Sequence, residues 1–456
     1  MTIEDIKDIN KSVKDCSLYY GHVNYTYLLR NIVISKIRNN KNIGNHPVKL
    51  NKMVIKYLLE GIFLKSHSFF TKYDSWVFSN SERRKLLTKK YIDRVASIVS
   101  SDKNQSCLFI ENPSLVGHKQ PTDDIIFSEA VFLLLSYIFS ILFFRKRKIN
   151  IDTSKLIELE EKYNIKINFQ PQLRRVIGQY FCLKFILKFR KPKQVFIVYP
   201  SGYYGYILAL KEKKIPIIEL QHGIIYELHP SYNNYVDDDF LIFKPDYILT
   251  YGDRDRRCLV SLKYLDQNHI FPIGNYMLWL YKQTKTENSS YLKNILSKVP
   301  SSKKIIAVTC TVNDLELFID LIKEINNIDN SFYFLLVPRI ENNIPLDSSI
   351  GVIVNPSKTN IYEIIKCCNI HLTQVSTCAL EALYFSKRSL IYEPNNVDES
   401  FFKKNYKDVK LDFFSCAKEF INITKQNIPI DINDIDNLFV DDIDIRFLKF
   451  MTLINN

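Results

Sequence analysis

Short apolar segments alternate with longer amphipathic ones between residues 195 and 394. The apolar segments have the length and β-branched content of buried strands, and the segments between them have the spacing of helices. The first group of expected strands covers 195–200, 215–220, 246–252 and 269–274, and the second covers 303–311, 332–338, 351–355, 370–376 and 389–394. Repeated β-α-β units of this kind predict parallel, doubly wound sheets.

A polar, helix-compatible connector around 282–302 separates the two groups of strands. We therefore expect an α/β protein with two Rossmann-like lobes, a hinge near 275–302, and a mostly helical extension before the first strand. In this division, residues 1–190 are the helical or mixed N-terminal part of the first lobe. Residues 191–285 are the Rossmann-like core of that lobe, and residues 286–456 are the second Rossmann-like lobe with a helical tail.

The chain of 456 residues has 62 Lys and Arg against 49 Asp and Glu, which gives a net charge of +13. This excess favours anionic partners such as nucleotides, phosphorylated lipids or an anionic membrane face, although a lysine-rich codon bias would produce it as well. The basic residues are scattered and match no nucleic-acid-binding module, so no nucleic acid is expected as a partner. Nine cysteines without metal-ligand spacing, together with the lack of a signal peptide, predict a cytoplasmic protein.

The segment 125–144 is almost entirely apolar and is followed at once by the four basic residues 145–148. It is about long enough to span a bilayer, but Glu129 interrupts it and no second span accompanies it. Three interpretations stay open: a helix buried in the first lobe, a helix on a membrane surface with a basic anchor, and a true span. Either of the last two would place the protein at the cytoplasmic face of a membrane.

Adjacent arginines occur in the N-terminal extension. Residues 79–82 predict a turn and a helix cap, which would place Arg83 and Arg84 in the first turn of a helix. The helix dipole disfavours cations at that position. An anionic partner and a solvated face each account for the pair.

The motif IPIIELQHG at 215–223 is the most informative part of the chain, because a buried strand runs straight into a Gln-His-Gly turn. The carboxyl ends of parallel strands are where α/β folds place their chemistry, and His222 brings an imidazole that titrates near neutral pH. Gly223 permits a sharp exit from the strand. Glu219 lies three residues before His222, and His229 lies in the following loop. His222 is either a general base or substrate contact, or a structural post that binds a phosphate or a carbonyl.

The glycine-rich motifs GxGxxG and GxxxxGK[ST] are absent, as are GxSxG and HExxH. Their absence argues against nicotinamide oxidoreductases and P-loop enzymes. A candidate anion site remains at Ser376 and Thr377, where a strand ends and a helix begins, because hydroxyls and free backbone N–H groups there suit a diphosphate. Glu381 lies one helical turn beyond Thr377 and would accept bonds from ribose hydroxyls. The alternative is that Ser376 only caps the helix and Glu381 is a plain surface residue.

Other strand ends in the second lobe carry donors. Arg339 follows the strand 332–338, and Thr309 and Thr311 belong to the end of the strand 303–311. Because the carboxyl ends of parallel strands meet at one edge of a sheet, we expect these side chains to line the same rim as Ser376.

The segments IELQHGII, PDYILTYGD, LLVPR and TQVSTCALEALYFSKRSLIYEP, in this order, resemble two-lobed glycosyltransferases of the GT-B type. The resemblance covers about 195–394 and is strongest for bacterial capsule and O-antigen enzymes, with teichoic-acid polymerases as more distant relatives. It implies that the second lobe binds a nucleotide-activated sugar donor and that the first lobe binds an oligosaccharide acceptor. His222 would lie near the transferred group, with Gln221, Gly223 and His229 on the acceptor side.

The resemblance also implies no metal and no other cofactor, because such enzymes offset the charge of the leaving diphosphate with helix N-termini and basic side chains. The three aspartates at 237–239 are expected to be solvated rather than chelating. Retaining relatives have a second glutamate about eight residues after the first. Glu381 is followed at that distance by Ser389, which favours an inverting mechanism.

Direct displacement is therefore the expected mechanism. His222, tuned by Glu219, takes the acceptor proton while Arg339, Ser376 and Thr377 stabilise the departing phosphate. A lipid-linked acceptor at the inner face of the cell membrane would account for the basic excess and the apolar segment. The alternatives are a CDP-polyol phosphotransferase of teichoic-acid type, a nucleotide-sugar epimerase, and a non-catalytic subunit of a polysaccharide-assembly complex.

Overall fold

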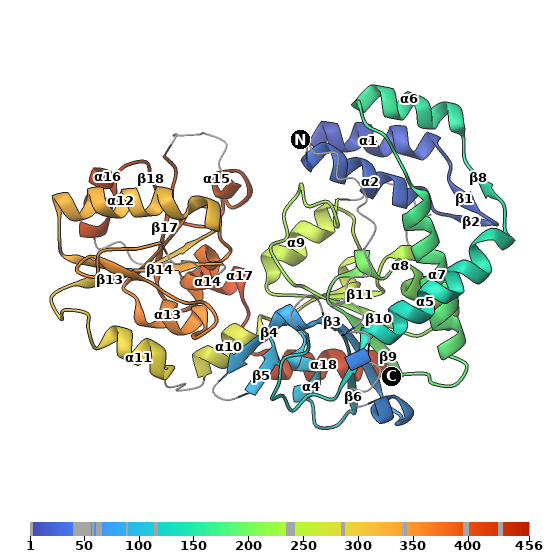
Figure 1. Ribbon diagram of the computed structural model, residues 1–456, viewed down its shortest axis with the longest axis horizontal. Coiled ribbons are helices and arrows are strands. Elements are labelled where there is room, and N and C mark those ends of the chain that lie inside the picture. Colours follow the sequence, from blue (N-terminus) through green and yellow to red (C-terminus); the bar gives the residue numbers. More distant parts are fainter. Residues whose placement is uncertain are drawn as a thin grey trace.

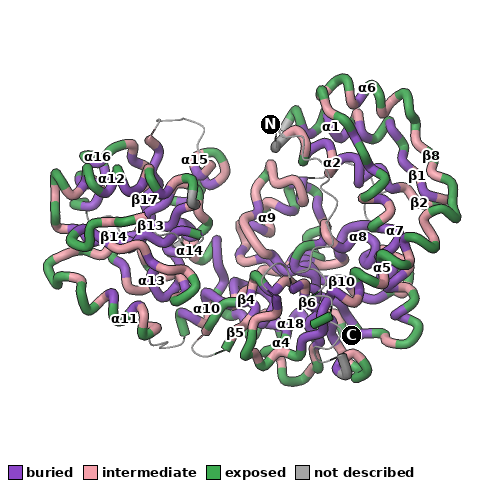
Figure 2. Tube along the Cα trace, viewed as in Figure 1, coloured by how far each residue is buried: buried purple, intermediate pink, exposed green. Residues whose placement is uncertain are grey.

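The computed structural model describes residues 3–39, 56, 59–60, 66–87, 90–113, 117–233, 242–283, 288–339, 341, 344–394, 401–426 and 432–455. The chain forms two α/β lobes that lie side by side (Figure 1). Each lobe is built around one parallel sheet, and the strands are largely buried (purple in Figure 2). The predicted fold class, two Rossmann-like lobes, is confirmed.

The first lobe contains a seven-stranded sheet in the order β12-β11-β10-β9-β3-β6-β7. All neighbouring pairs in it are parallel. Its strands are β3 (Ser75–Asn80), β6 (Cys107–Asn112), β7 (Ile126–Ser128), β9 (Gln194–Ile197), β10 (Ile217–Leu220), β11 (Tyr247–Thr250) and β12 (Ile270–Pro272). Trp76 and Phe78 point into one apolar layer and Val77 into the other, as the alternation of strand side chains requires. The sheet is therefore buried on both faces.

Helices cover both faces of this first sheet. One apolar layer contains residues of α1 (Ile3–Asp15), α2 (Thr26–Asn39), α5 (Glu129–Phe143), α7 (Gln170–Ile186) and α8 (Tyr204–Glu212). The other layer contains residues of α4 (Ser97–Ser101) and of the last helix, α18 (Ile443–Asn455). The remaining elements are α6 (Thr153–Tyr163), α9 (Asp253–Ser261), the hairpin of β4 (Arg84–Leu87) with β5 (Lys90–Asp93), and a small sheet of β1 (Tyr19–Tyr20), β2 (Val23–Asn24) and β8 (Ile149–Asn150).

The second lobe contains a six-stranded sheet in the order β15-β14-β13-β16-β17-β18, again with parallel neighbours only. Its strands are β13 (Lys304–Cys310), β14 (Phe332–Pro338), β15 (Gly351–Ile353), β16 (Ile370–Thr373), β17 (Arg388–Tyr392) and β18 (Asp412–Phe414). One apolar layer contains residues of α12 (Leu315–Ile328) and α16 (Ala417–Lys425), and the opposite one contains residues of α11 (Ser290–Leu296) and α13 (Ile361–Cys367).

A separate apolar cluster joins the two lobes. It contains residues of α10 (Tyr276–Gln283), α13, α14 (Cys378–Tyr384), α15 (Phe401–Asn405) and α17 (Ile432–Leu438). Side chains of the β4–β5 hairpin, Leu87 and Ile92, pack against the same cluster. The hairpin of the first lobe therefore reaches the second lobe, and it lies beside α10 (Figure 1).

The N-terminal extension is less helical than expected, because β3, β6 and β7 come from it and complete the first sheet. Strand β9 pairs with β10 on one side and with β3 on the other. Without the extension, β9 would therefore be an edge strand, so the extension is part of the lobe rather than an addition to it. The predicted helix at Arg83 and Arg84 is wrong. Asn80 caps only the single 3-10 turn η2 (Ser81–Arg83), through a 2.9 Å bond from the Glu82 N–H, and β4 follows directly.

The C-terminal tail, expected in the second lobe, returns to the first. Ile443, Phe447 and Phe450 of α18 pack against residues of the first sheet such as Val77. No helix in the described parts of the chain is both long enough and apolar enough to cross a membrane. The apolar segment 125–144 forms β7 and the 15-residue helix α5, which ends at Phe143.

Candidate functional site

A cavity lies where the two lobes meet, beside the carboxyl ends of β10 and β11 and next to α13 and α14. The first lobe lines it with Arg94, Gln221, His222, Gly223, Ile224, Tyr251, Asp255 and Asn275. The second lobe lines it with Tyr362, Thr377, Leu380, Glu381 and Tyr406, and Leu438 and Phe439 complete the wall. The enclosed volume is about 70 Å³ in this structure, whereas sites for small-molecule ligands hold roughly 300 Å³ or more. A nucleotide-sized ligand therefore requires the lobes to separate.

Gln221 fixes the Gln-His-Gly turn to the neighbouring strand. Its amide nitrogen donates to the Gly223 carbonyl at 2.8 Å and to the Asp255 carboxylate at 2.7 Å, and its amide oxygen accepts from the Tyr251 N–H at 2.6 Å. Asp255 is buried, and burial raises its pKa to about 7. All polar atoms of the Gln221 amide thus serve the turn, and its role is to hold His222 in place.

His222 has a different environment from a saturated core histidine. Its ring packs edge-on against Tyr199 with centroids 5.3 Å apart. The Nδ1 atom is buried and has no hydrogen-bond partner among the residues that the structure describes. Burial, and after it the positive charges of Arg83, His229 and Arg94, lower the pKa of His222 to about 3. The imidazole is therefore neutral at physiological pH and able to accept a proton.

Gly223 faces open space. A Cβ atom built on it would meet nothing within 4 Å, and its φ lies outside the left-handed region. Neither backbone strain nor crowding by the chain thus requires glycine here, contrary to the expectation of a sharp exit from the strand. What a side chain at this position would occupy is the cavity itself.

Two arginines of the first lobe lie beside His222. Their positions follow from the β4–β5 hairpin. In its strand register Arg84 lies opposite Asp93, and the Arg94 N–H donates to the Arg83 carbonyl at 3.1 Å. The hairpin therefore brings Arg83 and Arg94 side by side. Among the described residues, neither guanidinium has an ion pair within 4 Å or a side-chain hydrogen bond. Two such groups beside a cavity are suited to an anion with several oxygens.

Arg84, which adjoins Arg83 in sequence, is a structural residue instead. Its side chain is fully buried and paired with Glu111 and with Asp124, the latter at 2.7 Å. It also donates to the Thr122 hydroxyl at 3.1 Å. The two adjacent arginines thus differ in environment. Arg83, the last residue of η2, lies beside His222 and Arg94, whereas Arg84, the first residue of β4, lies in the interior.

The second lobe contributes a carboxylate and basic groups to the cleft. Glu381 accepts a 3.1 Å hydrogen bond from the Tyr362 hydroxyl, and burial raises its pKa while the charge of Arg94 opposes the rise. Arg339 is exposed at the end of β14. Desolvation lowers the pKa of Lys85 to about 8, and the charges of Arg94, Lys119 and Arg339 lower it further, which places Arg339 near the basic wall of the first lobe.

The other residues predicted at the second-lobe rim do not all line the cavity. Thr309 is buried inside the sheet, where its hydroxyl bonds to His371 at 2.9 Å, so it does not line the rim. Thr311 donates to Asp314 at 2.6 Å. Ser376 accepts a 3.3 Å bond from the N–H of Cys378, the first residue of α14, whereas Thr377, the N-cap residue, is exposed and lines the cavity.

Glu219 and His229 surround the turn without touching the Nδ1 atom of His222. Glu219 is buried and accepts 2.8 Å hydrogen bonds from the hydroxyls of Tyr232 and Tyr264. Burial raises its pKa to about 7. His229 stacks on Tyr232 and accepts from the Ser231 N–H at 3.3 Å, while its charge acts on His222.

Sequence reasoning missed Arg94, Tyr251 and Tyr362. The position of Arg94 could have been predicted, because the segment RRKLLTKKYIDR at 83–94 has the pattern of a hairpin, and a hairpin would place Arg83 opposite Arg94. Tyr362 had none, since only the packing of α13 against the lobe interface brings it to the cleft. The aspartates 237–239 lie outside the described residues, and within the described ones no cluster of three or more His, Cys, Asp or Glu is arranged to hold a metal ion.

Solved structures with the same architecture exist at low sequence identity. A UDP-N-acetylglucosamine 2-epimerase matches with a TM-score of 0.51 and 12% identity over 84% of this chain and 96% of that protein. The UDP-GlcNAc 2-epimerase of Methanocaldococcus jannaschii gives 0.51 and 10% over 83% and 99%. The enzyme of Neisseria meningitidis, bound to UDP-GlcNAc, gives 0.50 and 12% over 84% and 99%.

No protein family model matches the chain, and no curated protein sequence does either. At identities of 10–12%, the likeness to the solved structures extends to the fold alone. The chain has the two-lobed GT-B fold, with its cavity between the lobes.

Proposed function

We propose that this protein is a glycosyltransferase that moves a sugar from a nucleotide-activated donor to an oligosaccharide acceptor, with inversion and without a metal ion. The observation that carries the proposal is the set of unpaired groups at the cleft: Arg83 and Arg94 without an ion-pair partner in the described chain, beside a neutral His222 whose Nδ1 has no bond. The bacterial process that fits is synthesis of capsule or O-antigen polysaccharide in the cytoplasm, at the inner face of the membrane.

The donor diphosphate lies between the basic groups of both lobes. Arg83 and Arg94 bind it from the first lobe, and Arg339 and Thr377 approach it from the second. Negative charge grows on the leaving phosphate in the transition state, so fixed guanidinium groups stabilise that state more than the bound donor. Glu381 and the Tyr362 hydroxyl then face the ribose or the sugar, because a carboxylate accepts from hydroxyl groups.

His222 serves the acceptor. The acceptor hydroxyl oxygen forms the bond to the anomeric carbon while the bond from that carbon to the diphosphate oxygen breaks, and the hydroxyl proton passes to the imidazole. The low pKa of His222 arises first from burial and then from neighbouring positive charges. A bound diphosphate neutralises those charges, so the pKa of His222 rises toward neutrality when donor is present and the imidazole becomes a stronger base.

A nucleotide-sugar epimerase is the second candidate, since the solved structures with this fold include UDP-GlcNAc 2-epimerases. An epimerase changes the donor sugar without an acceptor, whereas a transferase needs one. A CDP-polyol phosphotransferase would use the same basic cleft but a donor without a sugar. A non-catalytic assembly subunit would consume no donor.

The test is incubation of the purified protein with a panel of UDP-, GDP-, dTDP- and CMP-sugars and with CDP-glycerol and CDP-ribitol, with and without oligosaccharide acceptors. Release of nucleotide that depends on an acceptor, together with inversion at the anomeric carbon, is the expected result. Conversion of UDP-GlcNAc to its 2-epimer without acceptor would instead establish the epimerase. Turnover of CDP-polyols alone would establish the phosphotransferase.

The matched variants are His222→Ala and, as a control, His22→Ala at an exposed position away from the cleft. The first is expected to lose turnover and the second to retain it. Equal activity of both variants would exclude a role of His222 in proton transfer.

A further inference from the structure

Helix α5 carries large apolar side chains on its outer side as well as on its inner side. The exposed residues form one stripe along the helix, since they occur in pairs every four positions: Leu133, Leu134, Tyr137, Ile138, Ile141 and Leu142. Between 37% and 61% of each side chain is open to solvent. A surface helix of a water-soluble lobe has the opposite pattern, with polar residues outward.

The inward side of α5 contains Phe132 in the core and, where it meets α7, small polar residues. Ser136 and Ser140 are buried, and they face α7 at Gly178, where a Cβ atom would lie 2.2 Å from the Ser136 carbonyl oxygen and 2.9 Å from the Ser140 Cβ. The Ser136 hydroxyl bonds to the Tyr206 hydroxyl at 3.2 Å. The helix is therefore held to the lobe by close backbone contact, by hydrogen bonds and by core residues such as Phe132, and its second apolar stripe is left for another surface.

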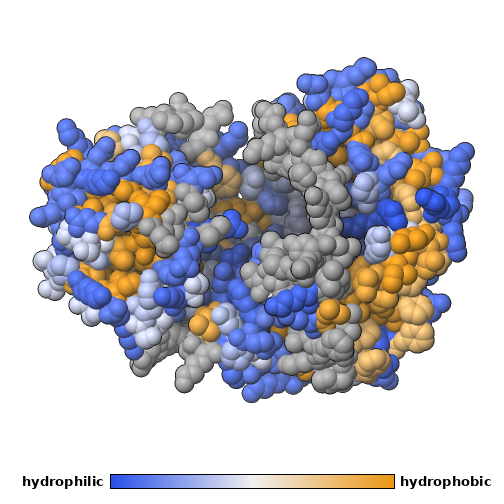
Figure 3. Space-filling view, viewed as in Figure 1, coloured by the Kyte–Doolittle hydropathy of each residue, from blue (hydrophilic) through white to orange (hydrophobic). Residues whose placement is uncertain are grey.

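The apolar surface continues beyond α5. Phe185, at the end of α7, and Phe189, just after it, are 45% and 65% exposed, and their rings pack edge to face, with Phe185 also against Phe139 of α5. The face of the molecule over α5 and α7 shows a contiguous hydrophobic area (orange, at the right of Figure 3). We call the exposed residues of α5, with Phe185 and Phe189, the α5 face. Contiguous apolar patches of this kind mark interaction surfaces.

The charge around the α5 face has one sign. The sequences 130–151 and 162–211 contain no Asp or Glu. Arg145, Lys146, Arg147 and Lys148, which follow the helix, are all exposed, as are Lys188 and Lys191 beyond α7. An apolar stripe with basic residues at its edge complements the two layers of an anionic bilayer surface, acyl chains beneath charged headgroups.

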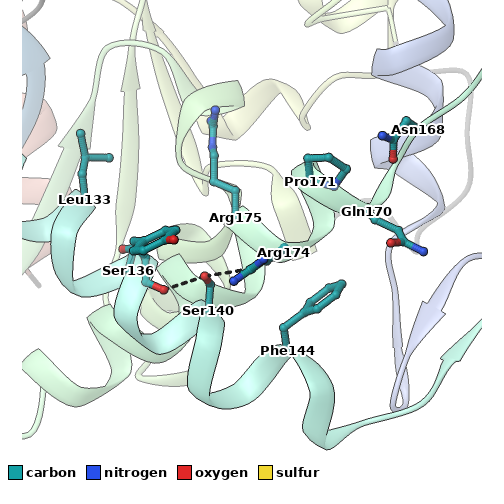
Figure 4. A pocket seen from close by; sticks show the side chains of 10 residues that line it. Leu133, Ser136, Ser140, Phe144, Asn168, Gln170, Pro171, Arg174 and Arg175 are labelled. Carbon is teal, nitrogen blue, oxygen red and sulfur yellow. Dashed lines mark hydrogen bonds between the residues drawn. The ribbon is translucent and has the colours of Figure 1, made fainter. Parts of the chain in front are cut away.

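A pocket of about 430 Å³ opens beside the same stripe (Figure 4). Leu133, Tyr137 and Phe144 line one side of it, and Arg174 and Arg175 line the other. Arg174 donates to the Ser140 hydroxyl at 3.3 Å and Arg175 to the Gly202 carbonyl at 2.8 Å, and among the described residues neither makes an ion pair within 4 Å. The pocket has the composition that a phosphate headgroup above an apolar chain requires.

We propose that the α5 face docks on an anionic phospholipid bilayer, with the stripe at the headgroup boundary, the basic residues on lipid phosphates, and the pocket around one headgroup. Docking does not depend on the transferase activity. Docking would, however, orient the cleft relative to the bilayer. Arg175 of the pocket donates to the Gly202 carbonyl, and Tyr199, three residues before Gly202, contacts the His222 ring. The bilayer surface and the acceptor side of the cleft are thus connected through one short segment, the 3-10 turn η4 (Pro200–Gly202).

Flotation of the full chain with vesicles tests the proposal. Vesicles of phosphatidylcholine with about one third phosphatidylglycerol are compared with pure phosphatidylcholine vesicles and with inorganic phosphate alone in competition. The expected result is binding to the anionic vesicles that weakens about tenfold or more without the anionic lipid and on raising salt, and that phosphate at the same ionic strength does not abolish. Phosphate competition that removes binding entirely would reduce the site to a free-phosphate site and overturn bilayer docking.

Two double variants separate apolar from electrostatic contributions. Ile141→Ser with Leu142→Ser is expected to weaken vesicle binding about tenfold or more, since each apolar side chain inserted adds to the partition. Lys146→Glu with Lys148→Glu is expected to abolish the preference for anionic lipid. The matched controls are Ile445→Ser with Leu448→Ser on the exposed side of α18, where Asp441, Asp442 and Asp444 lie nearby, and Lys418→Glu with Lys425→Glu on the second lobe.

Other occupants of the α5 face give different outcomes. If a second copy covers it, sedimentation will show an oligomer that the Ile141→Ser, Leu142→Ser variant dissociates, and vesicles will not bind; this overturns the proposal. Equal vesicle binding by the α5 and α18 variants overturns it as well. Tyr137→Trp with brominated lipids provides the direct readout, because only insertion of the stripe places that indole within quenching distance of the acyl chains.

Discussion

The two lobes each contain a buried neutral histidine, and the difference between them separates structure from function. In the second lobe, His371 on β16 is fully buried, and its ring nitrogens bond to the Thr309 and Ser389 hydroxyls at 2.9 and 2.8 Å. In the first lobe, His222 has a buried Nδ1 with no partner in the described chain. Burial lowers the pKa of each to about 3. The same lowered pKa thus occurs in a histidine with both ring nitrogens hydrogen-bonded, His371, and in one whose Nδ1 lacks a partner, His222.

The same contrast holds for two arginines that are adjacent in sequence. Arg84 is paired with two carboxylates inside the first lobe, and Arg83 stands in the cleft without an ion pair to any described residue. Buried polar groups are almost always satisfied, so we propose that the partner missing at the Nδ1 atom of His222, beside Arg83 and Arg94, is a ligand. The largest predicted effects follow from this contrast.

Replacement of His222 by Ala should produce the largest effect. We expect turnover to fall about 10²- to 10⁴-fold, the usual contribution of a general base, without loss of thermal stability, because the ring makes no hydrogen bond that folding needs. Initial rates with a saturating donor and the melting temperature are the measurements. A melting temperature that falls as steeply as the activity would place His222 with His371 as a structural residue.

Replacement of Arg84 should affect stability, and replacement of Arg83 should affect donor binding. Arg84→Gln leaves two buried carboxylates without a cation and should lower the free energy of unfolding by about 3–5 kcal/mol. Arg83→Gln should leave stability within about 0.5 kcal/mol of the wild type and weaken donor binding by roughly 10- to 100-fold, the value of a hydrogen bond to a charged group.

Denaturant unfolding and titration with a nucleotide diphosphate measure the two quantities. Arg190→Gln is a matched control outside the cleft, since its guanidinium bonds to backbone carbonyls at the surface. Weakened donor binding by the control and not by Arg83→Gln would remove the arginine from the site.

Local sequence patterns predicted the strands from β9 to β17, but not β3, β6, β7 or β18, and they predicted the site only in part. Parallel strands such as β14 are continuous apolar runs, so their identity and order follow from residues close together in sequence. Thr377 and Glu381 line the cavity, at positions that a strand end and a short helix determine, and their functional roles stay predictions. Arg94 depends on hairpin register, and Thr309 on the direction in which one strand residue points. A shift of one residue reverses that direction, and the pattern near the end of β13 does not determine it.

The pH dependence of stability sharpens the comparison further. His371 has a folded pKa of about 3, below the unfolded value of 6.5. Its contribution to stability is therefore complete above pH 6.5 and is lost as the pH falls toward 3, at a rate of up to about 1.4 kcal/mol per pH unit. His371→Gln keeps one donor and one acceptor without a titrating group, so its unfolding free energy should fall less between pH 6 and pH 4, by roughly 2 kcal/mol.

His22→Gln, at an exposed position, is the control for this titration and should follow the wild type. Urea unfolding at several pH values supplies the measurement. An acid dependence that is identical in all three proteins would mean that His371 becomes protonated in the folded state as readily as in the unfolded state, and both ring nitrogens would then donate, to the hydroxyl oxygens of Thr309 and Ser389.

The Glu219→Gln variant should give the smallest effect. It tests whether Glu219 is a structural residue, like His371, or acts on the pKa of His222. Its pKa is raised by burial from 4.5 to about 7, while Tyr232 and Tyr264 donate to it. For an acid with a raised folded pKa, stability is complete below pH 4.5 and is lost as the pH rises toward 7. In Glu219→Gln the amide oxygen accepts from one tyrosine hydroxyl and the amide N–H donates to the other, without a charge to bury, so the variant should be more stable than the wild type above pH 7, by about 1–3 kcal/mol.

If Glu219 only completes a tyrosine network, the Gln variant will retain the pH–rate profile of the wild type, because His222 is untouched. If it tunes His222, as the sequence suggested, the profile will shift although the fold is more stable. The hydrogen bonds favour the first outcome, since Tyr232 and Tyr264 each already donate to one of the Glu219 carboxylate oxygens. Glu219 would then stand beside His371 and Arg84, and His222, Arg83 and Arg94 would remain the groups whose partners arrive only with substrate.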